Sequence, residues 1–139
     1  MAVSTTMFHL ATRGEAEIID ITTHVAGAVA NSKLKDGIVT VFSPSSTSAI
    51  TTIEYESGAL SDLKRLFDEI INPQREYDHN ARWGDGNGHS HVRAALLGAS
   101  FTVPFVDERL TLGTWQQIIF IDFDNRPRKR ELVVQIIGE

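Results

Sequence analysis

The sequence predicts an α+β fold, with a mixed and mostly antiparallel β-sheet or sandwich, two main helices and a short third helix. Segments rich in Val, Ile, Phe and Thr outnumber the segments with helical spacing, which indicates more strand than helix. Residues 124–126, a turn-forming triplet, lie between the last two of these segments, which predicts a hairpin of antiparallel strands. The 139 residues, 42% of them hydrophobic, suit a single domain that covers residues 1–139.

Two segments have the apolar spacing of amphipathic helices. Thr22 or Thr23 is placed to cap the first, in which apolar residues recur three and four positions apart. The second carries one apolar stripe from Leu60 to Ile71 and ends just before a proline. A short third helix is expected over about 90–97, where apolar residues again share a face.

Six segments are expected to form strands, because β-branched and aromatic residues dominate them. Residues 72–90, by contrast, show little regular pattern and include the glycine-rich run 84–88. A long stretch without regular structure in a compact domain is usually functional, so this loop is where we expect the chemistry. The expected strands are 17–21, 37–42, 49–55, 100–106, 116–123 and 130–137.

The composition excludes several kinds of site and partner. A formal charge of −5 argues against the broad basic surface that non-specific nucleic-acid binding needs. Without cysteine the chain has no disulfide, thiolate metal site or cysteine nucleophile, so any metal would be held by histidine, carboxylate or water. No stretch approaches the ~20 apolar residues that cross a bilayer, and no signal-peptide pattern is present. We therefore expect a cytoplasmic protein without nucleic-acid or membrane partners.

Three histidines form the strongest candidate constellation. His79 lies early in the long loop, and His89 and His91 lie at its end. Neutral imidazoles bind zinc and similar ions, which makes a divalent metal, zinc or magnesium, a possible cofactor. Residues i and i+2 lie about 200° apart on a helix, so His89 and His91 share a ligand only if any helix starts at or after Ser90. The alternative is that these are loop histidines hydrogen-bonded to the backbone.

Carboxylates and arginines offer further candidates, each with an ordinary explanation. Glu54 and Glu56 share one face of an expected strand, and a solvated strand face explains both. Asp62 suits the first turn of the second helix, where the helix dipole favours an acid. Arg128 and Arg130 face the same way in an extended segment and would suit a phosphate group, or else protect a strand edge by charge.

Several motifs, taken together, resemble the YjbQ-like family over nearly the whole chain. They are Leu-Gly-Thr-Trp-Gln at 112–116, Ala-Ala-Leu-Leu-Gly-Ala-Ser at 94–100, Asp-His-Asn at 78–80, Ser-His at 90–91 and the closing Arg-Pro-Arg-Lys-Arg. The resemblance implies an α+β sandwich-like homotrimer with polar pockets near the subunit boundaries. It also implies weak thiamine-phosphate synthase activity, in which a pyrimidine diphosphate joins a thiazole phosphate and releases pyrophosphate.

The resemblance also implies roles for individual residues. The family's acidic positions fall on Glu54 and Asp62, and its histidines fall on His79 and His91. We accordingly expect Glu54, Asp62 and His91 to be catalytic and His79, His89 and His91 to bind metal. A phosphorylated metabolite would be the ligand, and its expected contacts are Ser46, Thr47, Asn87, Trp115, Gln116, Arg128 and Arg130.

One departure from the family pattern concerns a lost histidine. Many relatives have His-Thr-Thr or His-Thr-Ser where this chain has Ser45-Ser46-Thr47. His89, where other members often lack histidine, is a candidate to supply the missing imidazole. Two other functions also fit a cleft of histidines and carboxylates: a metal-dependent hydrolase of a small phosphorylated or amide substrate, and a non-catalytic trimeric metabolite-binding protein.

Overall fold

The structure, a computed structural model, describes all residues 1–139 and contains two antiparallel sheets. Every strand pairing is antiparallel, which confirms the expected α+β class. The first sheet has the order β1 (Ala2–Thr12), β8 (Arg128–Gly138), β3 (Gly37–Phe42), β5 (Ser100–Val106) and β6 (Arg109–Leu110). The second has the order β2 (Glu17–Asp20), β7 (Gln117–Asp122) and β4 (Ser48–Ile53).

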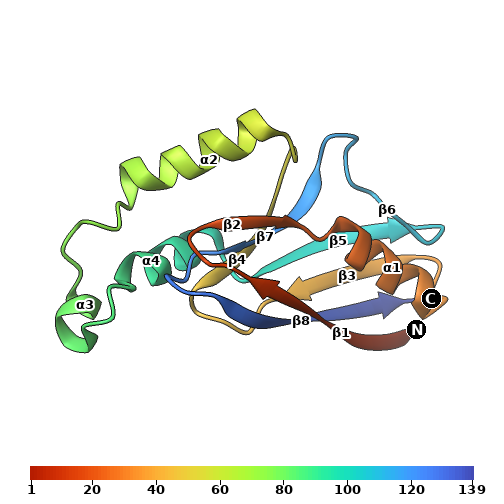
Figure 1. The fold of residues 1–139 in the computed structure, drawn as a ribbon. Coiled ribbons are helices and arrows are strands. Elements are labelled where there is room, and N and C mark those ends of the chain that lie inside the picture. The colour runs from red at the N-terminus through yellow and green to blue at the C-terminus, as the bar shows by residue number, and fades with distance from the viewer.

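Four helices accompany the sheets, one more than expected (Figure 1). The additional helix lies in the segment expected to be irregular, where Asp78 in the first turn and Arg82 in the last turn suit the helix dipole. The helices are α1 (Thr22–Ser32), α2 (Ser57–Ile70), α3 (Asp78–Trp83) and α4 (Gly88–Leu97). None of them is both long and apolar enough to cross a membrane.

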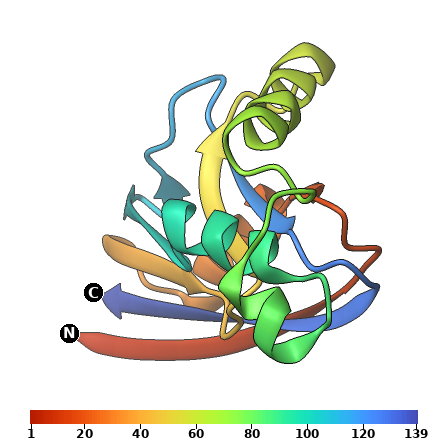
Figure 2. The ribbon, with the colours of Figure 1, turned by 90° about the vertical axis from the view of Figure 1, so that its left-hand side faces the viewer.

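The core consists of two apolar layers separated by the three-stranded sheet. Alternate residues of β7 point to opposite faces, so Ile118 and Phe120 join one layer while Ile119 and Ile121 join the other. The first layer fills the space between the two sheets and α1. The second lies between the outer face of the three-stranded sheet and helices α2 and α4, which cover that face in Figure 2.

The expected hairpin between the last two strands is wrong. β7 is already flanked by β2 and β4, so no edge of it is free to pair with β8. The chain instead crosses after Asp122 to the other sheet, where β8 pairs with β1 and β3. The first strand was not expected at all. It is an edge strand with one largely exposed face, so its hydrophobic alternation is weak.

The topology brings four chain segments together at one end of the two sheets. Ser48, the first residue of β4, pairs with Asp122, the last residue of β7. Thr12, the last residue of β1, pairs with Arg128, the first residue of β8. Helix α4 begins beside them, and Asn87 at its N-terminus contacts the loop that joins β7 to β8. Side chains from these segments therefore meet around a common space.

Candidate active site

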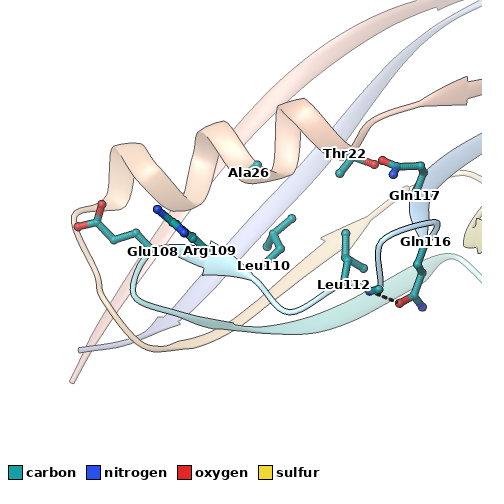
Figure 3. A pocket seen from close by; sticks show the side chains of 9 residues that line it. Thr22, Ala26, Glu108, Arg109, Leu110, Leu112, Gln116 and Gln117 are labelled. Atoms are coloured by element: carbon teal, nitrogen blue, oxygen red, sulfur yellow. Dashed lines mark hydrogen bonds between the residues drawn. The ribbon is translucent and has the colours of Figure 1, made fainter.

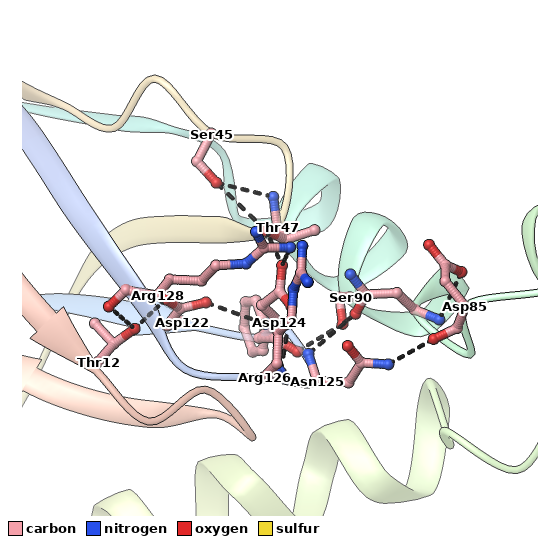
Figure 4. Close-up of polar contacts among 12 residues, drawn as sticks. Thr12, Ser45, Thr47, Asp85, Ser90, Asp122, Asp124, Asn125, Arg126 and Arg128 are labelled. Carbon is pink, nitrogen blue, oxygen red and sulfur yellow. Dashed lines mark hydrogen bonds and ion pairs between the residues drawn. The ribbon is translucent and has the colours of Figure 1, made fainter. Parts of the chain in front are cut away.

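A polar pocket of about 390 Å³ lies at this meeting point. Three segments form its walls: the loop before β4, the start of α4 and the crossing from β7 to β8 (Figure 4). No hydrophobic side chain lines it, which favours a strongly polar ligand. The residues that line this polar pocket are Pro44, Ser45, Ser46, Thr47, Asp85, Asn87, His91, Asp124, Arg128 and Arg130.

Beneath the pocket, Arg130 forms a two-pronged ion pair with the fully buried Asp122. Its Nε donates to Asp122 Oδ2 at 2.8 Å and its Nη2 donates to Oδ1 at 2.9 Å. The same guanidinium donates to Ser45 Oγ and Thr47 Oγ1, each at 2.8 Å. Arg130 is therefore largely committed to holding the serine-rich loop against β7 and β8. Few of its donors are left for the phosphate group that Arg128 and Arg130 were expected to bind together.

Asp124, two residues further on, connects the same loop to Arg128. Its Oδ2 accepts a hydrogen bond from Thr47 Oγ1 at 3.0 Å and lies 3.1 Å from Arg128 Nη2. Burial by itself would raise the pKa of Asp124, but hydrogen bonds from Arg128 and Thr47 outweigh it and hold the pKa below its ordinary value. Asp124 is thus ionised at neutral pH and orients the Arg128 side chain.

Arg128 keeps an unused donor. Its Nε is buried and has no hydrogen-bond partner within the chain. A buried donor without an acceptor is costly, so such a group is commonly satisfied by a ligand or water. The Arg128 side chain as a whole is 34% exposed and lines the pocket, so the exposed part of its guanidinium can meet an anionic oxygen there.

The start of α4 is fixed by a small hydrogen-bond cluster. Ser90 Oγ contacts both Asn87 Oδ1, at 2.5 Å, and the Phe123 carbonyl, at 2.6 Å. Asn87 Oδ1 also accepts from the backbone N–H of Asn125 at 3.1 Å. Asn87 lines the pocket as expected, but its amide oxygen already serves to attach α4 to the β7–β8 crossing.

Two of the three expected metal-binding histidines lie together. The rings of His79 and His91 are 4.4 Å apart between centroids and tilted by 39°. His79 Nδ1 is 3.3 Å from Asp85 Oδ1, and no atom satisfies it as a hydrogen-bond partner. His91 is half-buried and lines the polar pocket.

The structure does not bring His89 to the polar pocket. The condition under which His89 and His91 could share a ligand is not met, because α4 begins at Gly88 and places His89 about 200° around the helix from His91. His89 is 3% exposed and lies beside Tyr77, with 6.5 Å between ring centroids. Burial and the nearby charge of Arg93 lower the pKa of His89. It therefore does not replace the imidazole that relatives carry at position 45.

A metal ion does not fit the residues of a single chain. No group of three histidine, aspartate or glutamate side chains is arranged to share one ion. The nearest approach is His79 with His91 and Asp85, where the unpartnered Nδ1 of His79 lies close to the carboxylate. Further ligands from a substrate or another copy of the chain would be needed.

The expected acids lie elsewhere in the monomer. Glu54 follows the opposite end of β4 from Ser48, about 20 Å away at the usual rise of a strand. It lines a separate cavity of about 560 Å³ together with Trp115. Asp62 is exposed on α2, where it pairs with Arg65 at 2.6 Å. Neither acid reaches His91 within one chain.

The structure also changes the expected roles of Gln116 and Glu56. Gln116 lines a cavity of about 320 Å³ between α1 and β6 (Figure 3), and its Nε2 donates to Thr52 Oγ1. Glu56 does not lie on a strand face but caps α2, where its carboxylate accepts hydrogen bonds from the N–H groups of Gly58 and Ala59.

Sequence reasoning missed Asp122 and Asp124, the carboxylates that organise the pocket. A signal was present in the sequence: Asp122 interrupts the apolar run 118–123, and Asp124 follows directly after this run. Buried acids in a strand are rare unless they are paired, and the arginines at 128 and 130 are the available partners.

Comparison with known proteins identifies the family. The family model described as "UPF0047 protein YjbQ-like" matches residues 6–139. A UPF0047 protein of Methanothermobacter thermautotrophicus is 42% identical over 139 residues, covering 100% of this chain and 95% of that protein. The UPF0047 protein YugU of Bacillus subtilis is 33% identical over 123 residues, covering 88% of this chain and 90% of that protein.

Solved structures agree with this assignment. The crystal structure of a YbjQ-like protein of unknown function from Sulfolobus solfataricus superposes with a TM-score of 0.89 at 32% identity, covering 99% of this chain and 100% of that chain. An uncharacterised YjbQ/UPF0047 protein from Clostridium acetobutylicum gives a TM-score of 0.88 at 35% identity, with 95% and 99% coverage. The chain belongs to the YjbQ-like (UPF0047) family.

Proposed function

We propose that the polar pocket binds the phosphate of a small cytoplasmic metabolite and that the protein is a weak thiamine-phosphate synthase. The observation that carries the proposal is Arg128, a charged and 34% exposed side chain that lines a pocket without hydrophobic walls. A phosphate or diphosphate bound there would accept charge-assisted hydrogen bonds from its guanidinium. The family resemblance supplies the reaction, and the pocket supplies a place for its leaving group.

The proposed reaction exchanges one bond at a single carbon. The thiazole nitrogen forms a bond to the methylene carbon of the pyrimidine diphosphate. The bond between that carbon and the diphosphate oxygen breaks, and its electron pair leaves with pyrophosphate. Arg128 would stabilise the charge that grows on the leaving oxygens, and an N–H of His91 would donate a further hydrogen bond. Arg130 acts as a positioning residue, because its donors hold Asp122 and the serine-rich loop.

The test is release of pyrophosphate from the pyrimidine diphosphate and thiazole phosphate together. The wild-type protein should release pyrophosphate only when both precursors are present, and His91→Ala should lower the rate by about 10²-fold or more. His9→Ala is the matched control, since His9 is an exposed histidine on β1 that pairs only with Glu131. Wild-type protein that releases none, or a His91→Ala variant as active as His9→Ala, would refute the proposal.

A homotrimer is part of the same proposal. The outward face of the five-stranded sheet exposes apolar side chains, and exposed apolar surface of this kind favours association. A neighbouring copy is also the available source of the acids missing from the pocket, Glu54 and Asp62. Light scattering of the purified protein should give three times the monomer mass, and a monomeric mass would rule out this part of the proposal. The exposed apolar residues are Val3, Met7, Ile38, Phe42, Val106 and Ile137.

A second candidate, metal-dependent hydrolysis, is favoured by the contact between His79 and His91. Two adjacent imidazoles beside Asp85 would need additional ligands from a substrate or a second copy. Metal analysis of the purified protein separates the candidates. One zinc per chain that is lost in both His79→Ala and His91→Ala would support this function, whereas unchanged metal content in the two variants would exclude it.

If precursors bind without turnover, the pocket serves the remaining candidate, a non-catalytic metabolite-binding protein. The pairing of Asp124 with Arg128, and of Asp122 beneath the pocket with Arg130, favours it, because neither of these buried acids is free to act as a base. Tight binding of a phosphate ester with no pyrophosphate release would identify this function.

A further inference from the structure

A second compartment opens directly beside the polar pocket. It has a volume of about 260 Å³, and three residues line both spaces: Ser45, Ser46 and His91. The remaining lining consists of Ser48 and four small residues of α4 and the segment after it, namely Ala94, Ala95, Gly98 and Ala99. We call this space the small-residue compartment.

One face of α4 passes along both spaces. Residues three and four positions apart lie on the same side of a helix, so Asn87, His91 and Ala95 follow one another along the wall. The serine-rich loop forms the facing wall in both cases. His91 therefore stands where one continuous groove changes from polar to weakly apolar.

The two compartments differ in charge. Asp85, Asp124, Arg128 and Arg130 line the polar pocket, whereas no charged side chain lines the small-residue compartment. Its hydroxyls are also partly committed, since Ser48 Oγ bonds to Ser43 Oγ and Ser45 Oγ accepts from Arg130. A charged group placed there would lose water without gaining a partner, so the space disfavours ions.

We propose that the small-residue compartment holds the neutral, planar ring of a phosphorylated ligand whose phosphate lies against Arg128. This inference rests on the proposed function of the polar pocket and adds the residues that would hold the ring of the ligand. The volume suffices, because a cavity of ~150 Å³ already accommodates benzene. Alanine and glycine residues leave the space open, and Ser46, an exposed residue that lines it, offers a hydroxyl group for a ring substituent.

In this arrangement the linker that joins the ring to the phosphate lies beside His91, where the two compartments meet. A ligand with one carbon between the ring and the phosphate ester would place that carbon beside the imidazole. The side chain at position 95 then determines specificity, because it borders the ring and not the phosphate.

The test compares two probes, inorganic phosphate and benzyl phosphate, by calorimetric titration of the full-length protein. Ala95→Leu fills the small-residue compartment from an exposed helical position, where leucine is a good helix former. Ala30→Leu is the matched control, an exposed alanine on α1 outside both compartments. Wild type and Ala30→Leu should bind benzyl phosphate at least tenfold more tightly than phosphate. Ala95→Leu should lose this advantage while its Kd for phosphate changes less than twofold.

The possible failures are distinct. Equal affinity of the wild-type protein for both probes, or an Ala95→Leu variant that keeps the full preference for benzyl phosphate, would overturn the ring site and leave phosphate binding intact. If Ala95→Leu weakened the binding of both probes equally, the two spaces would not be separate, and the ring site would also be overturned. No binding of either probe by the wild-type protein would refute the proposed function and this inference with it.

Discussion

The guanidinium of Arg130 and the carboxylate of Asp122 meet through two hydrogen bonds of 2.8 and 2.9 Å at the base of the polar pocket. Asp122 is fully buried, and the Arg130 side chain is 13% exposed. Because this pair also holds Ser45 and Thr47, it connects the stability of the fold with the shape of the pocket.

Removing one partner of this pair should be strongly destabilising. Asp122→Ala removes the two-pronged partner of the nearly buried Arg130 and leaves only the longer contact of 3.6 Å with Asp124, so we expect a loss of about 3–5 kcal/mol in the free energy of unfolding. Urea titration measures it. Asp62→Asn, which breaks the exposed pair with Arg65, should change stability by less than about 1 kcal/mol. Equal effects of the two substitutions would contradict the structural role of Asp122.

Asp124 should make the protein sensitive to acid. Its pKa lies below the ordinary value in the folded state, so its ionisation adds stability above pH ~4, and this contribution disappears as the pH falls through the lower folded pKa. Asp124→Asn should flatten the dependence of unfolding free energy on pH below ~4. A variant with the same acid dependence as the wild type would show that the pairing with Arg128 contributes nothing.

His89 should make the stability of the protein depend on pH in a higher range than Asp124 does. Burial lowers its folded pKa, so the unfolded chain takes up a proton first, near pH ~6.5, and stability falls as the pH decreases from 7 towards 5. His89→Gln should reduce this slope, as measured by thermal melts between pH 5 and 8. His24→Gln, at an exposed position on α1, is the matched histidine control. An undiminished slope in His89→Gln would place the proton uptake elsewhere.

The attachment of α4 should depend on one buried hydroxyl. Ser90→Ala removes the group that contacts both Asn87 Oδ1 and the Phe123 carbonyl, at an expected cost of about 1–3 kcal/mol. Ser61→Ala, exposed on α2, should cost less than about 0.5 kcal/mol. If both variants unfold at the same urea concentration as the wild type, the cluster does not stabilise the start of α4.

The fold class was predictable because alternation and helical spacing are local properties. All six expected strands overlap closely with observed ones, and both main helices are present. The expected hairpin failed because pairing depends on which strand edges are free, and β2 and β4 occupy both edges of β7. Local spacing carries no information about that choice.

The site was predictable only in part. His91, Thr47 and Arg128 line the polar pocket as expected, since the loop and the final strand carry recognisable polar motifs. His89 was misplaced because the start of α4 depends on the tertiary contacts of Ser90 with Asn87 and Phe123. Glu54 was misplaced because it lies beyond the opposite end of β4, a separation that sequence order conceals.

Calorimetric titration of inorganic pyrophosphate into Arg128→Gln and Lys129→Gln tests the central claim most directly. Arg128 lines the pocket, whereas Lys129 is the exposed next residue and points to the other side of β8. Loss of a charge-assisted hydrogen bond should weaken binding by about 10- to 100-fold in Arg128→Gln, and Lys129→Gln should bind like the wild type. Equal affinity of both variants and the wild-type protein would contradict phosphate recognition by Arg128.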